Sequence, residues 1–335
     1  MSERRAWVLN LDAEHELEAP RHYEPTRHLK SIVQRERVRL LGALVRPQDV
    51  LVTEEALRER GAELARGLAG HAWSPTPRAL RLLRAAGAIP VDVPTLEVLR
   101  EVNARPFAAS VREPLQLASF DKRVVATLDE GLVQLARPAP HGWLVRRSFG
   151  AAGRGRRRIA SGRPDAGELA WLVASLRRGP LVVEPWVEIV REHTRSGWIT
   201  REGAVSISAP CFQAVDEHGA WTRTELAELD ALARDDDRRL EEAMEVVGRA
   251  LAARGYFGAF GVDAYRHRAL DGSGRTVLNP LSEINARYTM DWALAMGERA
   301  VATASSGTRP TSPAARRAPS RTPCAAPQRL PPDRP

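Results

Sequence analysis

Two runs near the C-terminus, Gly258-Ala-Phe-Gly-Val-Asp263 and Glu283-Ile-Asn285-Ala-Arg287, flank the sequence Asp271-Gly-Ser-Gly274. The middle segment is a strong turn signal between residues that are typical of β-strands. If the chain folds back there as a hairpin, Asp263 lies opposite residue 282 or 283. Because strand side chains alternate between the two faces of a sheet, Glu283, Asn285 and Arg287 would share one face.

This hairpin would gather two carboxylates, one amide oxygen and one guanidinium, from Asp263, Glu283, Asn285 and Arg287. Oxygen ligands of this kind hold hard cations such as Mg²⁺, and a guanidinium beside the cation suits an anion such as a nucleotide phosphate. The same pattern is compatible with a surface hairpin whose charges are solvated. The rest of the sequence has to separate these two interpretations.

Composition indicates a soluble protein that is large enough for two domains. The 335 residues are 43% hydrophobic and 27% charged, and no run of about 18 apolar residues indicates a membrane span. The N-terminus lacks the apolar core of a signal peptide. The two cysteines, Cys211 and Cys324, form neither a disulfide framework nor a zinc-binding spacing. We therefore expect a cytoplasmic protein that does not bind a membrane.

A net charge of +8 would suggest a nucleic-acid partner, but the distribution of the charge does not. Residues 301–335 carry six arginines and one aspartate, so most of the surplus lies in a tail rich in Ala, Ser, Pro and Arg. Such a tail cannot bury enough apolar surface to offset the entropy of ordering, and we predict that it is disordered. The folded body has little surplus charge, which argues against nucleic acid as a partner.

The first third of the chain alternates short β-like and helical runs. Such alternation predicts a small parallel α/β layer, which we assign to an N-terminal domain at residues 1–115. The expected strands are Trp7–Leu11, Asp49–Val52 and Ile89–Val93, and the expected helices are Glu54–Leu68, Pro77–Ala86 and Thr95–Val102.

A second α/β segment begins near Phe120. The expected strands are Gly142–Arg147 and Pro180–Val187, with a helix at Asp165–Arg177 between them. An amphipathic helix is predicted over Asp230–Ala253, and Gly255 is placed to end it. We assign residues 116–300 to one further domain.

The strand at Gly142–Arg147 opens into a loop with Gly150, Gly153 and Gly155 and several arginines. Glycines let backbone N–H groups approach phosphate oxygens, and arginines neutralise phosphate charge. The glycine order matches neither a Walker A motif nor Gly-x-Gly-x-x-Gly. A flexible, arginine-rich surface hairpin remains the alternative.

The strand at Pro180–Val187 runs into Glu184-Pro-Trp-Val187, followed by Glu188 and Glu192. Proline removes a donor and ends the ladder, so the segment leaves the sheet with backbone groups available to a planar base. The alternative is an ordinary strand end with solvated glutamates.

Taken in order, these segments resemble the ATP-grasp superfamily over residues 115–300. The family pattern has a basic residue ahead of the central domain, a basic residue leading into a glycine-rich loop, an acidic hinge, and a late Asp…Glu-x-Asn metal site. The resemblance implies an α/β fold in which two α/β subdomains clasp ATP, preceded by the small parallel α/β domain. Where the family usually has a lysine before the loop, this chain has Arg146 or its neighbour Arg147.

The resemblance also implies a role for each matching residue, with ATP and Mg²⁺ as cofactors. The phosphates of ATP would be contacted by Lys122 and Arg146 and covered by the loop with Gly150, Gly153 and Gly155. The adenine would be held by Glu184 and the backbone near Val187, and the ribose by Glu192 or Glu188. Mg²⁺ would be bound by Asp263, Glu283 and Asn285. Arg287 would neutralise the transferring phosphoryl group or a substrate carboxylate.

The expected activity is that of an ATP-grasp ligase with small-molecule carboxylate and amine substrates. A carboxylate would be activated as an acyl phosphate and joined to an amine, releasing ADP and phosphate. Substrate specificity is expected to come partly from Asn10, Trp73, Asn103 and Arg105. The alternatives are a biotin-carboxylase-like or kinase-like enzyme on the same fold, and a non-catalytic protein that binds nucleotides or nucleic acid.

Overall fold

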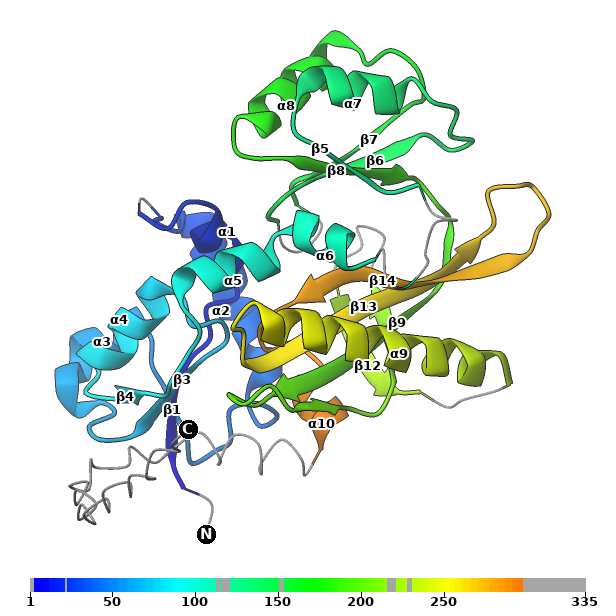
Figure 1. Cartoon of the computed structure of the whole chain (residues 1–335). Coiled ribbons are helices and arrows are strands. Elements are labelled where there is room, and N and C mark those ends of the chain that lie inside the picture. The colour runs from blue at the N-terminus through cyan, green and yellow to red at the C-terminus, as the bar shows by residue number, and fades with distance from the viewer. Residues whose placement is uncertain are drawn as a thin grey trace, which may run out of the picture.

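The computed structural model describes residues 3–21, 23–112, 115, 121–150, 154–215, 221–227 and 231–297. These residues form three β-sheets with helices packed around them (Figure 1). Within these ranges no helix is both long and apolar enough to cross a membrane. Gly153 and the tail at 301–335, for which we predicted a phosphate contact and disorder, lie outside the described residues.

The N-terminal sheet is parallel, as the alternation of strands and helices predicted. Its strand order is β2-β1-β3-β4, with β1 at Arg5–Val8, β2 at Val50–Leu51, β3 at Ala69–Ala72 and β4 at Ile89–Pro90. The helices of this region are α1 at Ala13–Glu18, α2 at Arg27–Arg37, α3 at Glu54–Arg60, α4 at Pro77–Ala85 and α5 at Leu96–Asn103.

Two features of this sheet differ from the sequence analysis. The sequence of β3, Ala-Gly-His-Ala, lacks the β-branched residues that mark a strand, so β3 was not predicted. The helix predicted over Glu54–Leu68 was too long. α3 ends at Arg60, because Gly61 adopts a positive φ of 54° and a short 3₁₀ turn at Gly61–Glu63 follows.

The second sheet is small, antiparallel and covered by helices on one side. Its order is β5-β8-β6-β7, with β5 at Arg123–Val125, β6 at Trp143–Arg147, β7 at Arg156–Ile159 and β8 at Leu181–Pro185. The helices α7 at Leu128–Leu135 and α8 at Ala166–Leu176 pack on it around Trp143, Val145 and Leu172. This lobe lies at the top of Figure 1.

The third sheet is larger and also antiparallel. Its order is β12-β11-β9-β13-β14, and β10 pairs with β9. The strands are β9 at Ile189–Ile199, β10 at Val205–Ile207, β11 at Cys211–Val215, β12 at Trp221–Leu226, β13 at Gly258–Arg268 and β14 at Thr276–Asn285. The short helices α6 at Arg105–Val111 and α10 at Trp292–Met296 pack beside it.

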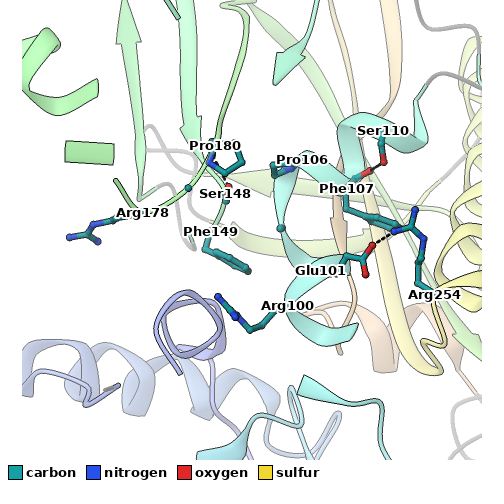
Figure 2. A pocket seen from close by; sticks show the side chains of 12 residues that line it. Arg100, Glu101, Pro106, Phe107, Ser110, Ser148, Phe149, Arg178, Pro180 and Arg254 are labelled. Atoms are coloured by element: carbon teal, nitrogen blue, oxygen red, sulfur yellow. Dashed lines mark hydrogen bonds and ion pairs between the residues drawn. The ribbon is translucent and has the colours of Figure 1, made fainter. Parts of the chain in front are cut away.

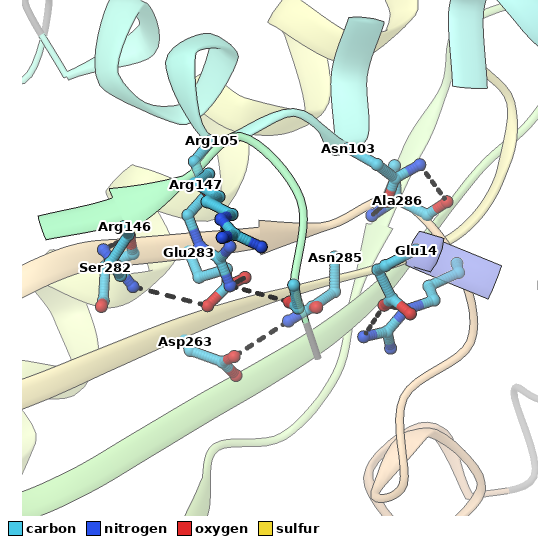
Figure 3. A network of polar contacts seen from close by, with 12 residues as sticks. Glu14, Asn103, Arg105, Arg146, Arg147, Asp263, Ser282, Glu283, Asn285 and Ala286 are labelled. Carbon is cyan, nitrogen blue, oxygen red and sulfur yellow. Dashed lines mark hydrogen bonds and ion pairs between the residues drawn. The ribbon is translucent and has the colours of Figure 1, made fainter. Parts of the chain in front are cut away.

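The long helix α9 at Ala231–Ala253 confirms the amphipathic prediction. Its apolar residues Leu240, Met244, Val247 and Leu251 are fully buried in one core with residues of β13 and β14. Val262 and Ile284 belong to that core. Because side chains alternate along a strand, the neighbouring Asp263 and Glu283 project from the opposite face, where Arg146 of the small antiparallel lobe lies near Glu283 (Figure 3).

Candidate active site

The hairpin has the register that the turn signal predicted. In the β13–β14 ladder Asp263 pairs directly with Glu283, and Gly261 pairs with Asn285. The amide Nδ2 of Asn285 donates a hydrogen bond to Asp263 Oδ2 over 2.9 Å. The three side chains proposed as metal ligands therefore lie together on one sheet face (Figure 3).

The electrostatics of this face suit a cation. Burial, together with the nearby carboxylates of Glu283 and Asp291, raises the pKa of Asp263 to about 7. Within the described ranges no group of three His, Cys, Asp or Glu side chains could hold a metal, so the set is two carboxylates and one amide. The charged form of Asp263 is disfavoured by burial, and Mg²⁺, which binds oxygen donors, would stabilise it.

Two basic groups of the small lobe reach this hairpin. Arg146 of β6 lies with its Nη1 3.6 Å from Glu283 Oε2 and donates from Nη2 to the carbonyl oxygen of Ser282 over 3.4 Å. Lys122, just before β5, donates to the same carbonyl over 3.0 Å. The sequence analysis predicted that these cations contact phosphates, and the structure brings both to the β13–β14 hairpin.

Glu184 of β8 holds the two cations together. Its carboxylate lies 2.7 Å from Arg146 Nη2 and 3.3 Å from Lys122 Nζ, and the three side chains are less than 10% exposed. Burial alone would raise the pKa of Glu184, but Arg146 and Lys122 lower it. Burial also lowers the pKa of Lys122 to about 7. The carboxylate that we expected at the adenine is thus committed to ion pairs.

The neighbour of Arg146 faces away from the site. Arg147 Nε donates to Ser175 Oγ over 2.9 Å, and its guanidinium lies 5.3 Å from the ring centroid of Trp171 on α8. Of the two arginines considered for the phosphate contact, Arg146 is the one whose guanidinium contacts the hairpin.

The glycine-rich loop begins with a tight turn after β6. A Cβ on Gly150 would lie 2.5 Å from the carbonyl oxygen of Arg154, and Gly155 has a positive φ of 71°. The amide of Arg147 donates to the carbonyl of Gly155 over 2.9 Å, which closes the loop at its base. Side chains are sterically disfavoured at these two glycines.

The predicted hinge residues lie where the chain crosses from the small lobe to the large sheet. Val187, between β8 and β9, packs against Tyr265. Glu192 of β9 is partly buried, and burial raises its pKa. Glu188 is exposed and pairs with Arg268 over 2.8 Å. Of the two glutamates considered for a ribose, Glu192 is the one that faces the protein interior.

Arg287 lies beyond the strand that was expected to place it beside Glu283 and Asn285. β14 ends at Asn285, and beyond it the alternation of side chains stops. The guanidinium of Arg287 pairs with Glu14 over 2.5 Å and lies 5.4 Å from the ring centroid of Trp73. It still acts on the carboxylate electrostatically. Burial alone would raise the pKa of Glu283, but Arg105, Arg146 and Arg287 together lower it.

Sequence reasoning placed Arg105 only among possible specificity residues. In the structure Arg105 Nη2 lies 2.8 Å from Glu283 Oε1 (Figure 3). Asn103, from the same group, accepts a hydrogen bond from the amide of Ala286 over 2.9 Å and fixes the end of β14. These contacts join residues more than 170 positions apart, and no local pattern announces them.

A hollow of about 470 Å³ lies beside this site (Figure 2). Its lining includes Phe107 and Phe149, together with arginines from three segments, Arg100, Arg178 and Arg254. None of the predicted ATP or metal residues lines it.

Comparison with known proteins identifies the architecture. No protein-family model matches the sequence, and no curated protein matches it. Among solved structures, D-alanyl-alanine synthetase A from Vibrio cholerae superposes with a TM-score of 0.51 at 12% identity, over 92% of this chain and 95% of that one. Rhizobium etli pyruvate carboxylase gives a TM-score of 0.52 at 13% identity, over 93% of this chain and 29% of that one. The chain has the ATP-grasp fold.

The ATP-grasp fold explains why two sheets meet at this hairpin. The small antiparallel lobe supplies Arg146, Glu184 and the glycine-rich loop, and the large sheet supplies Asp263 and Glu283. A ligand held by both sets of residues would lie between the sheets. At 12–13% identity the superposition establishes the fold alone, so the chemistry must be argued from the side chains.

Proposed function

We propose that this chain is an ATP-dependent ligase that activates a substrate carboxylate and joins it to an amine. The observation that carries the proposal is that a group of oxygen ligands and a group of basic side chains lie next to each other where the two antiparallel sheets meet. Asp263, Glu283 and Asn285 provide oxygen ligands, and Lys122 and Arg146 provide positive charge opposite them.

In this proposal the triphosphate of ATP lies between the two sets. Asp263, Glu283 and Asn285 would hold Mg²⁺, which when bound would neutralise phosphate oxygens. Lys122 and Arg146, which now pair with Glu184 and Glu283, would also contact the phosphate oxygens. Because these groups are almost fully buried, their charges act on the phosphates with little screening by water.

The remaining contacts to ATP are proposed from the family resemblance. The loop from Gly150 to Gly155 would cover the triphosphate. The adenine would lie against the crossing near Val187, with Glu192 at the ribose. Partial burial of Glu192 supports this choice over the exposed Glu188.

The chemistry would proceed in two displacements. An oxygen of the substrate carboxylate attacks the γ-phosphorus, and the bond to the β-phosphate oxygen breaks, giving an acyl phosphate and ADP. An amine then attacks the acyl carbon, and phosphate leaves as the new C–N bond forms. Arg287 lies beside Glu14 and Trp73 at the N-terminal side of the site, which supports a role at the substrate carboxylate.

The test is ADP release from Mg-ATP with a panel of carboxylic acids and amines. We expect ADP and phosphate in equal amounts only when a suitable acid and amine are both present. Glu283→Gln should lower this rate by more than about 100-fold, since even outer-shell partners of metal ligands are worth 10- to 100-fold. The matched control Glu188→Gln removes an exposed carboxylate and should leave the rate unchanged.

Other outcomes would replace the proposal. ADP release that yields a phosphorylated product without an amine would indicate a kinase-like enzyme, and release that depends on bicarbonate would indicate a carboxylase-like one. Nucleotide binding with no turnover across the panel would indicate a non-catalytic nucleotide-binding protein.

A further inference from the structure

We propose that the hollow of about 470 Å³ is a binding site for a small organic anion with a flat apolar body, such as an aromatic carboxylate or an aromatic phosphate ester. This inference goes beyond the proposed ligase reaction and does not depend on it, because none of the residues assigned to ATP or Mg²⁺ lines the hollow.

Parts of the chain that are distant in sequence form the walls of the hollow. Its volume of about 470 Å³ lies within the roughly 300–1,000 Å³ that is usual for small-molecule sites. The charged and aromatic lining residues come from α5, α6, the small antiparallel lobe and the segment directly after α9, and they are Arg100, Glu101, Phe107, Phe149, Arg178 and Arg254.

The charges of the lining favour an anion. Three arginines, Arg100, Arg178 and Arg254, line the hollow together with a single carboxylate, that of Glu101. Positive charge therefore exceeds negative charge on its walls. Carboxylate and phosphate oxygens form charge-assisted hydrogen bonds with guanidinium groups, whose planar fork matches both kinds of anion.

These arginines use only part of their hydrogen-bonding capacity. Arg100 donates from Nε to the carbonyl oxygen of Leu17 over 2.9 Å, and Arg178 Nη1 lies 3.5 Å from Glu18 Oε2. Arg254 pairs through Nη1 with Glu101. Because a guanidinium has five N–H donors, most donors of Arg100, Arg178 and Arg254 have no protein acceptor within the described part of the chain and are available to a ligand.

The apolar part of the lining suits a flat ring. Phe107 is 7% exposed and belongs to the core of α9, β13 and β14, and Phe149 packs against that core. The guanidinium carbon of Arg254 lies 5.6 Å from the ring centroid of Phe107. In Figure 2, Phe149 lies between Arg178 and Arg254, with Arg100 beside its ring. A ligand ring could pack on the phenylalanines while its anionic group contacts the arginines.

Glu101 gives the proposal a prediction of opposite sign. Its carboxylate occupies Arg254 and would repel an anion in the hollow. Loss of this carboxylate should therefore strengthen anion binding, whereas loss of Arg254 should weaken it. An ion pair that only held the walls together would give weaker binding in both cases.

The experiment is titration calorimetry of the full-length chain with probes that share the naphthalene ring. Naphthoate and naphthyl phosphate carry the two kinds of negative charge, naphthalenemethanol is neutral, and naphthylmethylammonium is positive. We expect both anions to bind at least about tenfold more tightly than the alcohol, because they add a charge-assisted contact, and the ammonium to bind most weakly. The tighter of the two anions identifies whether the site prefers a carboxylate or a phosphate.

Three variants locate the binding. Arg254→Gln should weaken both anions by about tenfold, and Glu101→Gln should tighten them by about threefold. The side chains of Arg254 and Glu101 are 50% and 46% exposed, so both variants should fold, which equal melting temperatures would verify. Arg249→Gln is the matched control, because Arg249 also pairs with a glutamate of α9, over 3.5 Å, but does not line the hollow. It should leave the affinities within about twofold of the wild type.

Four results would overturn the proposal. They are equal binding of the anions and the alcohol, equal binding of the anions to Arg254→Gln and Arg249→Gln, weaker anion binding to Glu101→Gln, and displacement of the anions by saturating Mg-ATP, which would place them in the nucleotide site. If Arg254→Gln does not fold, Arg178→Gln replaces it with the same expected loss, since that side chain is 55% exposed. None of these measurements uses ADP release, so the ligase proposal stands or falls separately.

Discussion

Removal of the charge of Glu184 should destabilise the protein more than any exposed carboxylate of the same lobe. Glu184 is 2% exposed and holds two buried cations, Arg146 over 2.7 Å and Lys122 over 3.3 Å. In Glu184→Gln the shape is kept, but both cations lose their charged partner. The variant therefore isolates the electrostatic part of this contact.

The size of the expected loss of stability depends on whether each cation can lose its charge or keep another partner. Breaking a buried ion pair by removing one partner costs about 3–5 kcal/mol, because the other charge stays buried without compensation. Lys122 has a pKa of only about 7 even beside Glu184, so in the variant it can lose its proton and become neutral. Arg146 cannot, but Glu283 remains 3.6 Å away. We therefore expect the lower end of the range, about 3 kcal/mol.

Urea unfolding followed by tryptophan fluorescence measures this loss. The unfolding free energy of Glu184→Gln should fall by about 3 kcal/mol, with a melting temperature lower by roughly 6–12 °C for a region of this size. Glu188→Gln is the matched control, since that exposed pair with Arg268 should contribute less than about 1 kcal/mol. Equal losses in the two variants would refute the argument that burial makes the Glu184 pairs strong.

Two more predictions test the site and the core. Because the pKa of Asp263 is raised from 3.8 to about 7, the folded state binds more protons than the unfolded chain between these values, so metal-free protein should lose stability as the pH rises through this window. We would measure urea unfolding midpoints of the wild type and of Asp263→Asn from pH 4 to 8 in the presence of EDTA. The decrease of the midpoint with pH should disappear in Asp263→Asn, and equal pH dependence in the two proteins would contradict the prediction. Gly197→Ala should cost about 1–3 kcal/mol, because its Cβ would lie 2.5 Å from the Phe260 ring. In contrast, Gly131→Ala within α7 should stabilise the protein by up to about 1 kcal/mol, because a Cβ there meets no close neighbour. Calorimetry should therefore show opposite shifts in melting temperature for Gly197→Ala and Gly131→Ala, and similar shifts would contradict the argument from the Phe260 contact.

Much of the candidate site could be predicted because it depends on local order along the chain. The turn at Asp271–Gly274 brings Asp263 opposite Glu283, and strand alternation then places both carboxylates on one face. Arg146 could be located because it lies near the end of a strand that leads into a glycine-rich segment. The domain boundaries and the nucleotide contacts of Val187 and Glu192 remain predictions.

Other features escaped the sequence for physical reasons. β3 lies between β1 and β4 but consists of small residues and a histidine, so its position comes from the packing of the parallel sheet. The side-chain alternation expected to reach Arg287 ends at Asn285, where Asn103 binds the backbone of Ala286. Neither effect has a local signal, because each depends on residues distant in sequence.

The sequence by itself determined the periodic elements, the hairpin register and the chemical kinds of side chain on each strand, since these follow from spacing along the chain. Only the tertiary structure decided which charges meet. Glu184 lies between Arg146 and Lys122 because β8 pairs with both β6 and β5 in one antiparallel sheet. Arg105 reaches Glu283 across 178 positions because α6 packs beside β14. Coulombic interaction between buried groups depends on distance in space, and spacing in the sequence does not contain that distance.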